Sequence, residues 1–165
     1  MAAKESAGIL LFRGGAAPAA PEVLLVHPGG PFWARKDLGA WSIPKGGPEE
    51  GEDPRACALR ELAEELGPAA PAIALEDLTE LGSIRQKGGK VVHAWAAEAE
   101  FDPAALDSNR FELEWPPRSG ERREFPEVDR AEWFAPEEAR RRIIAAQQQF
   151  IDRLLEIRPY TRRDG

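Results

Sequence analysis

The feature that most constrains this chain is a 22-residue acidic segment, GGPEEGEDPRACALRELAEELG, at positions 46–67. It holds seven acidic residues and two arginines, a net charge of −5, whereas the whole 165-residue chain carries −7. Its second half has clear helix signals, because Asp53 suits an N-cap, Pro54 the first helical position and Gly67 the stop. The segment therefore predicts a helix over 53–66 that concentrates much of the chain's excess charge.

The acidic side chains gather on one face of this helix. At about 100° per residue, the leucines and Ala63 form an apolar stripe, and Glu61, Glu64 and Glu65 lie opposite. A solvated face of an amphipathic helix is the ordinary explanation. However, like charges at these spacings repel, and the carboxyl end of a helix disfavours anions. A divalent cation removes both objections, and carboxylate oxygens suit Mg²⁺ or Mn²⁺.

The residues around the acidic face fit the same interpretation. Glu52 precedes the helix and can reach back to Arg60, which can in turn hold Glu61 or Glu64. Orienting carboxylates is a task suited to a planar guanidinium. The pair Gly46–Gly47 allows a sharp turn and a close approach to a ligand. A purely structural acidic helix would need neither feature.

Short strand-like runs surround the helix. Strands are expected at 7–12, 22–27, 41–43, 78–86, 90–101 and 129–135, and a helix in one piece or two at 136–157. The first two runs predict a hairpin with a long loop, and 78–101 predicts a second one. We therefore predict one α+β domain over 1–165, an α/β/α sandwich with a mixed sheet. An irregular insertion at about 102–126 is expected as an ordered lid or as an extra hairpin.

The composition limits the setting of the protein. An apolar fraction of 42% and a charged fraction of 31% are typical of a globular protein, and the acidic balance argues against nucleic acid or an anionic membrane as partner. The single cysteine, Cys57, excludes an intrachain disulfide and favours a reducing compartment. We expect a cytoplasmic protein, and the sequence does not decide between a monomer and a homodimer.

The spacing of the acidic segment resembles a known motif. The pattern from Gly46 to Gly67 is similar to the Nudix box, Gx5Ex7REUxEExGU, in which U is a bulky aliphatic residue. Every fixed position agrees, and only the last U differs, since that position is Pro68. By its order of elements, nearly the whole chain resembles a Nudix hydrolase. The resemblance implies hydrolysis of a nucleoside diphosphate linked to another group, with divalent metal and an attacking water.

The resemblance also assigns roles by position. The metal ligands would be Glu61, Glu64 and Glu65, with the backbone carbonyl near Gly46 as a further candidate. Glu52 and Arg60 would orient these ligands.

A further carboxylate often precedes the tryptophan of a late strand in this family. Counting back six residues from Trp133 reaches Glu127, which we predict to be an accessory ligand or the general base. A loop glutamate facing water is the alternative, and Glu124 is the second candidate.

The residues at the start of the box bear on the substrate. The stretch WSIPKG at 41–46 resembles diadenosine polyphosphate and diphosphoinositol polyphosphate hydrolases, in which Lys45 would pair with an extra phosphate. Arg85, Lys87 and Lys90 would either extend this positive patch or form a solvated turn.

The tryptophans are candidates for stacking on a nucleobase, and the intact box favours an enzyme over a sensing module. Trp33 and Trp41 flank the box and are the preferred residues for stacking on a base. The leading prediction is a Mg²⁺-dependent pyrophosphohydrolase of nucleoside triphosphates or dinucleoside polyphosphates. The alternatives are a diphosphoinositol polyphosphate or nucleotide-sugar hydrolase, a nucleotide-sensing module without catalysis, and an acidic interaction domain.

Overall fold

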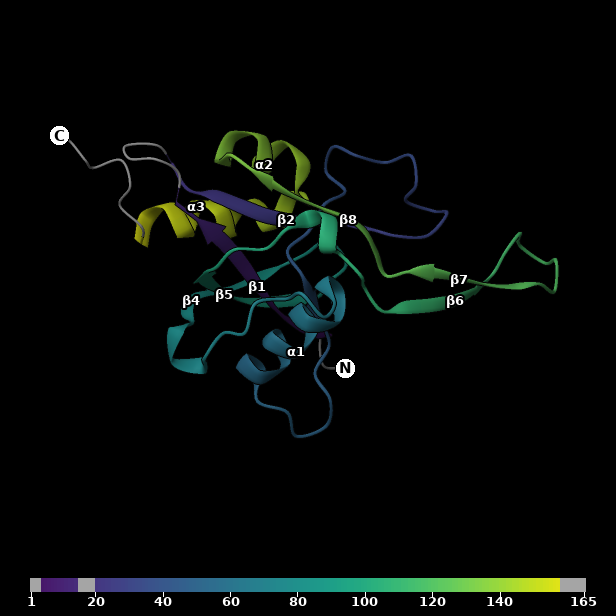
Figure 1. Ribbon diagram of the computed structural model, residues 1–165, viewed down its shortest axis with the longest axis horizontal. Helices are drawn as coiled ribbons and strands as arrows, with labels where there is room; N and C mark the ends of the chain where they lie inside the picture. The colour runs from purple at the N-terminus through teal and green to yellow at the C-terminus, as the bar shows by residue number, and fades with distance from the viewer. Residues whose placement is uncertain (1–3, 15–19, 158–165) are drawn as a thin grey trace.

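The computed structural model describes residues 4–14 and 20–157. A mixed sheet runs through the molecule in the order β4-β5-β1-β2-β8, with β3 beside β1 (Figure 1). Its strands are β1 (Glu5–Arg13), β2 (Glu22–Pro28), β3 (Lys45–Gly46), β4 (Thr79–Arg85), β5 (Val91–Glu98) and β8 (Val128–Phe134). β1 and β5 are parallel, whereas the other pairs are antiparallel. The predicted mixed sheet is confirmed.

Helices cover both faces of this sheet, so the predicted α/β/α sandwich is confirmed. Figure 1 shows α1 (Pro54–Leu66) on one side, and α2 (Pro136–Arg142) with α3 (Gln148–Ile157) on the other. Successive side chains of a strand point to opposite faces. In β1, Leu10 joins the core cluster beneath α2 and α3, whereas Leu11 joins the cluster beneath α1.

The C-terminal helix predicted at 136–157 is divided. A 3-10 turn (Ala145–Gln147) separates α2 from α3. The break is occupied by the backbone of Trp41, whose N–H donates to the carbonyl of Arg142 at 2.9 Å and whose carbonyl accepts from Ile144 N–H at 2.8 Å. None of the helices in the described residues is long and apolar enough to cross a membrane.

The start of the acidic segment is held against the central strand. A strand was predicted at 41–43, but Trp41 and Ser42 form only single bridges there. The regular pairing comes later, where β3 lies antiparallel to β1 with Gly46 opposite Ala7. β1 and β2 pair only through their ends, so the first predicted hairpin is short, and part of its connection lies outside the described residues.

The insertion predicted at about 102–126 is more regular than expected. It holds a 3-10 turn (Pro103–Ala105) and an antiparallel hairpin of β6 (Arg110–Glu114) and β7 (Arg122–Pro126), which forms its own sheet. Figure 1 shows this hairpin extending away from α1. Trp115, just after β6, packs edge-on against Phe32 at 5.4 Å between ring centroids, so the hairpin lies against the loop that follows β2. Whether it acts as a lid or only as an extra hairpin stays a prediction. Only the root of the hairpin lies beside the helix.

Candidate functional site

The box helix α1 has the predicted ends. The Asp53 carboxylate accepts hydrogen bonds from the backbone N–H groups of Arg55 and Ala56, at 3.0 and 3.2 Å, and Pro54 occupies the first turn. Gly67 ends the helix with a positive φ of 93°, a conformation that glycine adopts readily. These caps fix which residues of α1 face the sheet and which face the site.

Glu61 lies closer to the protein interior than the amphipathic pattern indicates. Its side chain is only 12% exposed, and its carboxylate packs over the Cα of Gly46. A Cβ at position 46 would collide with that carboxylate. Glycine is therefore required here to make room for Glu61, rather than to permit the sharp turn that the sequence suggested.

One guanidinium organises the acidic face. Arg60 donates to both carboxylate oxygens of Glu52, at 2.8 and 2.9 Å. Its Nη1 donates to Glu61 at 3.1 Å and to Glu64 at 2.9 Å. These hydrogen bonds from Arg60 lower the pKa of Glu52 to about 2. The structure therefore brings together Glu52, Arg60 and two of the three predicted ligands.

Glu127 joins the same cluster from another part of the chain. It lies between β7 and β8, where its backbone N–H donates to the carbonyl of Asn109 at 2.8 Å. Burial raises its pKa, and the charge of Glu64 adds to the shift. The second candidate, Glu124, is instead an exposed residue of β7 opposite Glu112.

The pKa values of Glu61 and Glu65 are also raised, so their surroundings disfavour the charged form of each carboxyl group. Burial, followed by repulsion from Glu64, raises the pKa of Glu61. Burial raises the pKa of Glu65 to about 8, and Glu61 and Glu127 add to the shift whereas Lys45 opposes it. Such mutual repulsion in a partly dry site is relieved by a cation.

The donor set fits a hard divalent cation such as Mg²⁺ in chemistry, since every candidate ligand is a carboxylate or carbonyl oxygen. As arranged, however, no three His, Cys, Asp or Glu side chains in the described part of the chain are placed to hold a metal ion. Glu61 and Glu64 each accept a hydrogen bond from Arg60 on one carboxylate oxygen, Oε2.

A small cavity of about 190 Å³ opens beside the glutamates. We call it the inner pocket, and its polar walls include Lys45, Glu65 and Glu127, with Trp33 among its apolar lining. The backbone N–H of Lys45 donates to Glu65 at 3.3 Å. Burial, followed by the charge of Lys90, lowers the pKa of Lys45. Lys45 and Trp33 therefore line the same pocket as Glu65 and Glu127.

The position of Trp41 corrects a prediction made from the sequence. It is fully buried, packed edge-on against Phe134 at 5.2 Å between ring centroids. Its indole N–H donates to Asp37 at 2.8 Å. A base cannot stack on a ring that the core encloses, so the stacking role predicted for Trp41 is wrong. Trp33 remains, with 39% of its surface exposed.

The predicted positive patch is only partly assembled. Arg85 donates to the carbonyl of Gly89 at 3.1 Å, within the turn between β4 and β5. Arg85 and Lys87 are exposed, and neither contacts a glutamate of the cluster within the described residues. Of the three residues of the predicted patch, only Lys90 lies close enough to Lys45 for its charge to lower the Lys45 pKa. The structure thus favours the solvated-turn explanation for Arg85 and Lys87.

Sequence reasoning missed the residues that anchor Glu127. Ser108 is buried, and its hydroxyl accepts from the backbone N–H of Val128 at 3.1 Å. Asn109 donates its backbone N–H to the carbonyl of Glu64 at 2.9 Å. No local pattern marks these contacts, because they join segments about 20 and 45 residues apart in the chain.

Comparison with known proteins agrees with this geometry. The family model described as "NUDIX domain" matches residues 3–154, nearly the whole chain. The chain belongs to the NUDIX family.

Curated NUDIX relatives match over short stretches. An RNA pyrophosphohydrolase of Roseobacter denitrificans is 64% identical over 31 residues, 19% of each chain. Nudix hydrolase 25 of Arabidopsis thaliana is 53% identical over 38 residues, 23% of this chain and 22% of that protein. The matches therefore span about a fifth of the length of these relatives.

Solved NUDIX structures match over nearly the whole fold. A Caenorhabditis elegans Ap4A hydrolase in a binary complex is 21% identical with a TM-score of 0.60, covering 94% of this chain and 98% of that one. The NUDIX domain of Shewanella oneidensis NrtR, complexed with ADP ribose, is 19% identical with a TM-score of 0.62, covering 95% and 89%. At these identities, the likeness establishes the fold.

Proposed function

We propose that this protein is a Mg²⁺-dependent pyrophosphohydrolase that cleaves a phosphoanhydride bond of a nucleoside triphosphate or dinucleoside polyphosphate by attack of water. One observation carries the proposal. Glu61, Glu64 and Glu65 of α1 converge with Glu127 from the β7–β8 junction, beside Lys45 and the inner pocket. A charged cluster of this kind, next to a cavity, is the arrangement expected of a phosphate-processing site.

The chain's own residues divide the work in this proposal. Bound Mg²⁺ would neutralise phosphate oxygens and acidify a water molecule. Glu61, Glu64 and Glu65 would hold it, with the Gly46 carbonyl as a further oxygen donor. Arg60, fixed by Glu52, positions Glu61 and Glu64. Such orienting contacts keep ligands in a productive geometry.

The remaining residues act on substrate and water. Glu127, whose pKa is raised by burial, is the candidate base that removes a proton from the attacking water. Lys45 supplies a positive charge for a phosphate at the inner pocket. Trp33 offers an exposed ring at the rim, where a nucleobase can stack.

A second candidate substrate is the 5′-polyphosphate end of RNA. The observation that favours it is the local identity of 64% to an RNA pyrophosphohydrolase. The chain's net charge of −7 disfavours extended contact with nucleic acid. Only the terminal phosphates and the first base would then contact the site.

The test is a substrate panel with Mg²⁺, in which chromatography identifies the products. The panel contains a nucleoside triphosphate, a dinucleoside tetraphosphate, a nucleotide sugar, a diphosphoinositol polyphosphate and a 5′-triphosphorylated oligoribonucleotide. The proposal predicts that one of the first two is turned over fastest and that a chelator stops the reaction. Fastest turnover of the inositol or sugar compound would support the corresponding alternative. Binding of nucleotides without turnover would indicate a sensing module.

A further inference from the structure

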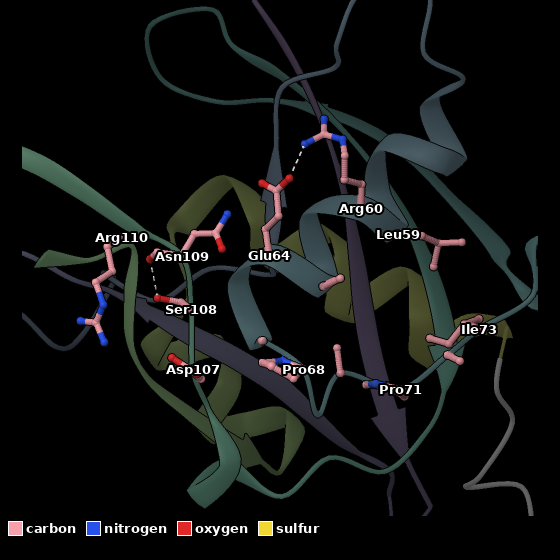
Figure 2. A pocket seen from close by; sticks show the side chains of 14 residues that line it. Leu59, Arg60, Glu64, Pro68, Pro71, Ile73, Asp107, Ser108, Asn109 and Arg110 are labelled. Atoms are coloured by element: carbon pink, nitrogen blue, oxygen red, sulfur yellow. Dashed lines mark hydrogen bonds and ion pairs between the residues drawn. The ribbon is translucent and has the colours of Figure 1, made fainter.

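A second and larger cavity, of about 930 Å³, lies on the other side of the glutamates. We call it the outer cavity. Figure 2 shows it between the segment 107–110 and the loop 67–73, with Arg60 and Glu64 at one end. None of the roles described so far uses this space.

The walls of the outer cavity are fixed by backbone contacts. The N–H groups of Asp107 and Asn109 donate to the carbonyls of Leu66 and Glu64, at 3.0 and 2.9 Å. These carbonyls belong to the last turn of α1, where helices leave acceptors unpaired. Gly67 permits the close approach, because a Cβ there would collide with the carbonyl of Asp107. The cavity is therefore built into the fold.

The outer cavity and the inner pocket flank the same row of glutamates. Glu64 lines the outer cavity, and its neighbour Glu65 lines the inner pocket. A backbone hydrogen bond of 2.8 Å joins Asn109 of the outer cavity to Glu127 of the inner pocket. A polyphosphate bound at the glutamates would thus have a cavity at each end.

The lining of the outer cavity suits a flat ring with polar edges. Leu59, Ala63 and Ile73 supply an apolar surface. The side-chain amide of Asn109 carries donors and an acceptor, and within the described residues no protein group is hydrogen-bonded to it. A nucleobase matches both features, since it stacks on apolar surface and hydrogen-bonds at its edge.

We propose that the outer cavity binds the second nucleoside of a dinucleoside polyphosphate, while the first enters the inner pocket. The inference rests on the proposed function, and it selects one of its two substrate classes. Size supports it, because ligand sites usually measure about 300–1,000 Å³. The outer cavity lies in this range, whereas the inner pocket of about 190 Å³ holds only part of such a substrate.

The test is calorimetric binding of two non-hydrolysable analogues in the presence of Mg²⁺. One is a methylene-bridged dinucleoside tetraphosphate, and the other is a methylene-bridged nucleoside triphosphate, which lacks the second nucleoside. Ala72→Trp fills the outer cavity, and Ala69→Trp is its matched control, because Ala69 lies in the same exposed loop but does not line the cavity. Asn109→Ala removes the amide while leaving both backbone hydrogen bonds in place.

The proposal predicts that Ala72→Trp and Asn109→Ala weaken binding of the dinucleoside tetraphosphate analogue about tenfold relative to binding of the triphosphate analogue. Ala69→Trp should leave this ratio at the wild-type value. An unchanged ratio in both cavity variants would overturn the inference. The wild-type protein tests the proposed function separately from the outer-cavity proposal. Its failure to bind or hydrolyse any phosphoanhydride compound would overturn the proposed function itself.

Discussion

The Arg60 guanidinium donates two parallel hydrogen bonds to the Glu52 carboxylate, from Nε to Oε2 at 2.8 Å and from Nη2 to Oε1 at 2.9 Å. The remaining nitrogen, Nη1, reaches Glu61 and Glu64. One planar group therefore fixes three carboxylates, each from a known direction. A fork of this shape is specific to arginine, because the lysine ammonium is a single point of charge.

Arg60→Lys should lower turnover about 10–100-fold, the usual cost of losing an orienting partner of a metal ligand. Lysine preserves the positive charge, but it cannot donate the two parallel hydrogen bonds that Arg60 makes to Glu52. Steady-state kinetics at saturating Mg²⁺ measure the effect. Arg55→Lys, on the exposed side of the same helix, is the control. A lysine variant at position 60 with wild-type turnover would make Arg60 a structural residue only.

Stability in acid should depend on Glu52. Its pKa falls from the ordinary value of 4.5 to about 2 in the folded protein, chiefly through the Arg60 hydrogen bonds. A lowered pKa stabilises the fold above the unfolded value, and this contribution is lost as the pH falls from about 4.5 to about 2. Glu52→Gln should therefore unfold more easily at neutral pH and lose less stability on acidification.

Urea denaturation at about pH 7 and about pH 3 measures this difference. Glu50→Gln is the matched control, since Glu50 is an exposed residue of the same loop. Parallel pH profiles of the wild-type protein and Glu52→Gln would contradict the assigned pKa shift.

Cys57 should be unreactive in the native protein. Its side chain is fully buried in the core beneath α1, and burial raises the pKa of the thiol to about 11. The thiolate is the reactive form, so Ellman's reagent should label the folded protein slowly and the denatured protein completely. Rapid labelling of the native protein, at its single cysteine, would show that the core packing beneath α1 is wrong.

Lys45 should act on phosphate binding. Lys45→Met keeps most of the buried volume but removes the charge beside Glu65, so the KM for a nucleoside triphosphate should rise about tenfold. Lys87→Met removes an exposed charge from the β4–β5 turn and should change little. Equal effects of the two substitutions on the KM would show that Lys45 does not bind the substrate.

The sequence predicted what depends on local pattern. α1 begins at Pro54, one residue inside the predicted 53–66, because capping residues act on their own backbone. The resemblance to the Nudix family implied Glu127, by its distance from Trp133, and Glu127 does lie at the acidic cluster.

The errors come from contacts between distant segments. Trp41 looked available because the sequence does not show that Ile143 and Phe134 enclose it. The role of Gly46 follows from the position of Glu61 above it, which depends on how α1 packs on β3. Asn109 and Ser108 carry no local signal at all, since their partners lie on α1 and β8.

The most direct test of the central claim is the Mg²⁺-dependent turnover of Glu65→Gln, measured beside the wild-type protein and Glu50→Gln. Glu65 lies in the wall of the inner pocket, against the backbone of Lys45, whereas Glu50 is exposed in the preceding loop. We expect Glu65→Gln to keep its circular dichroism spectrum but to lose about 100-fold or more in turnover, and Glu50→Gln to stay near wild type. Near-normal turnover of Glu65→Gln at saturating Mg²⁺ would show that Glu65 does not hold a catalytic metal ion.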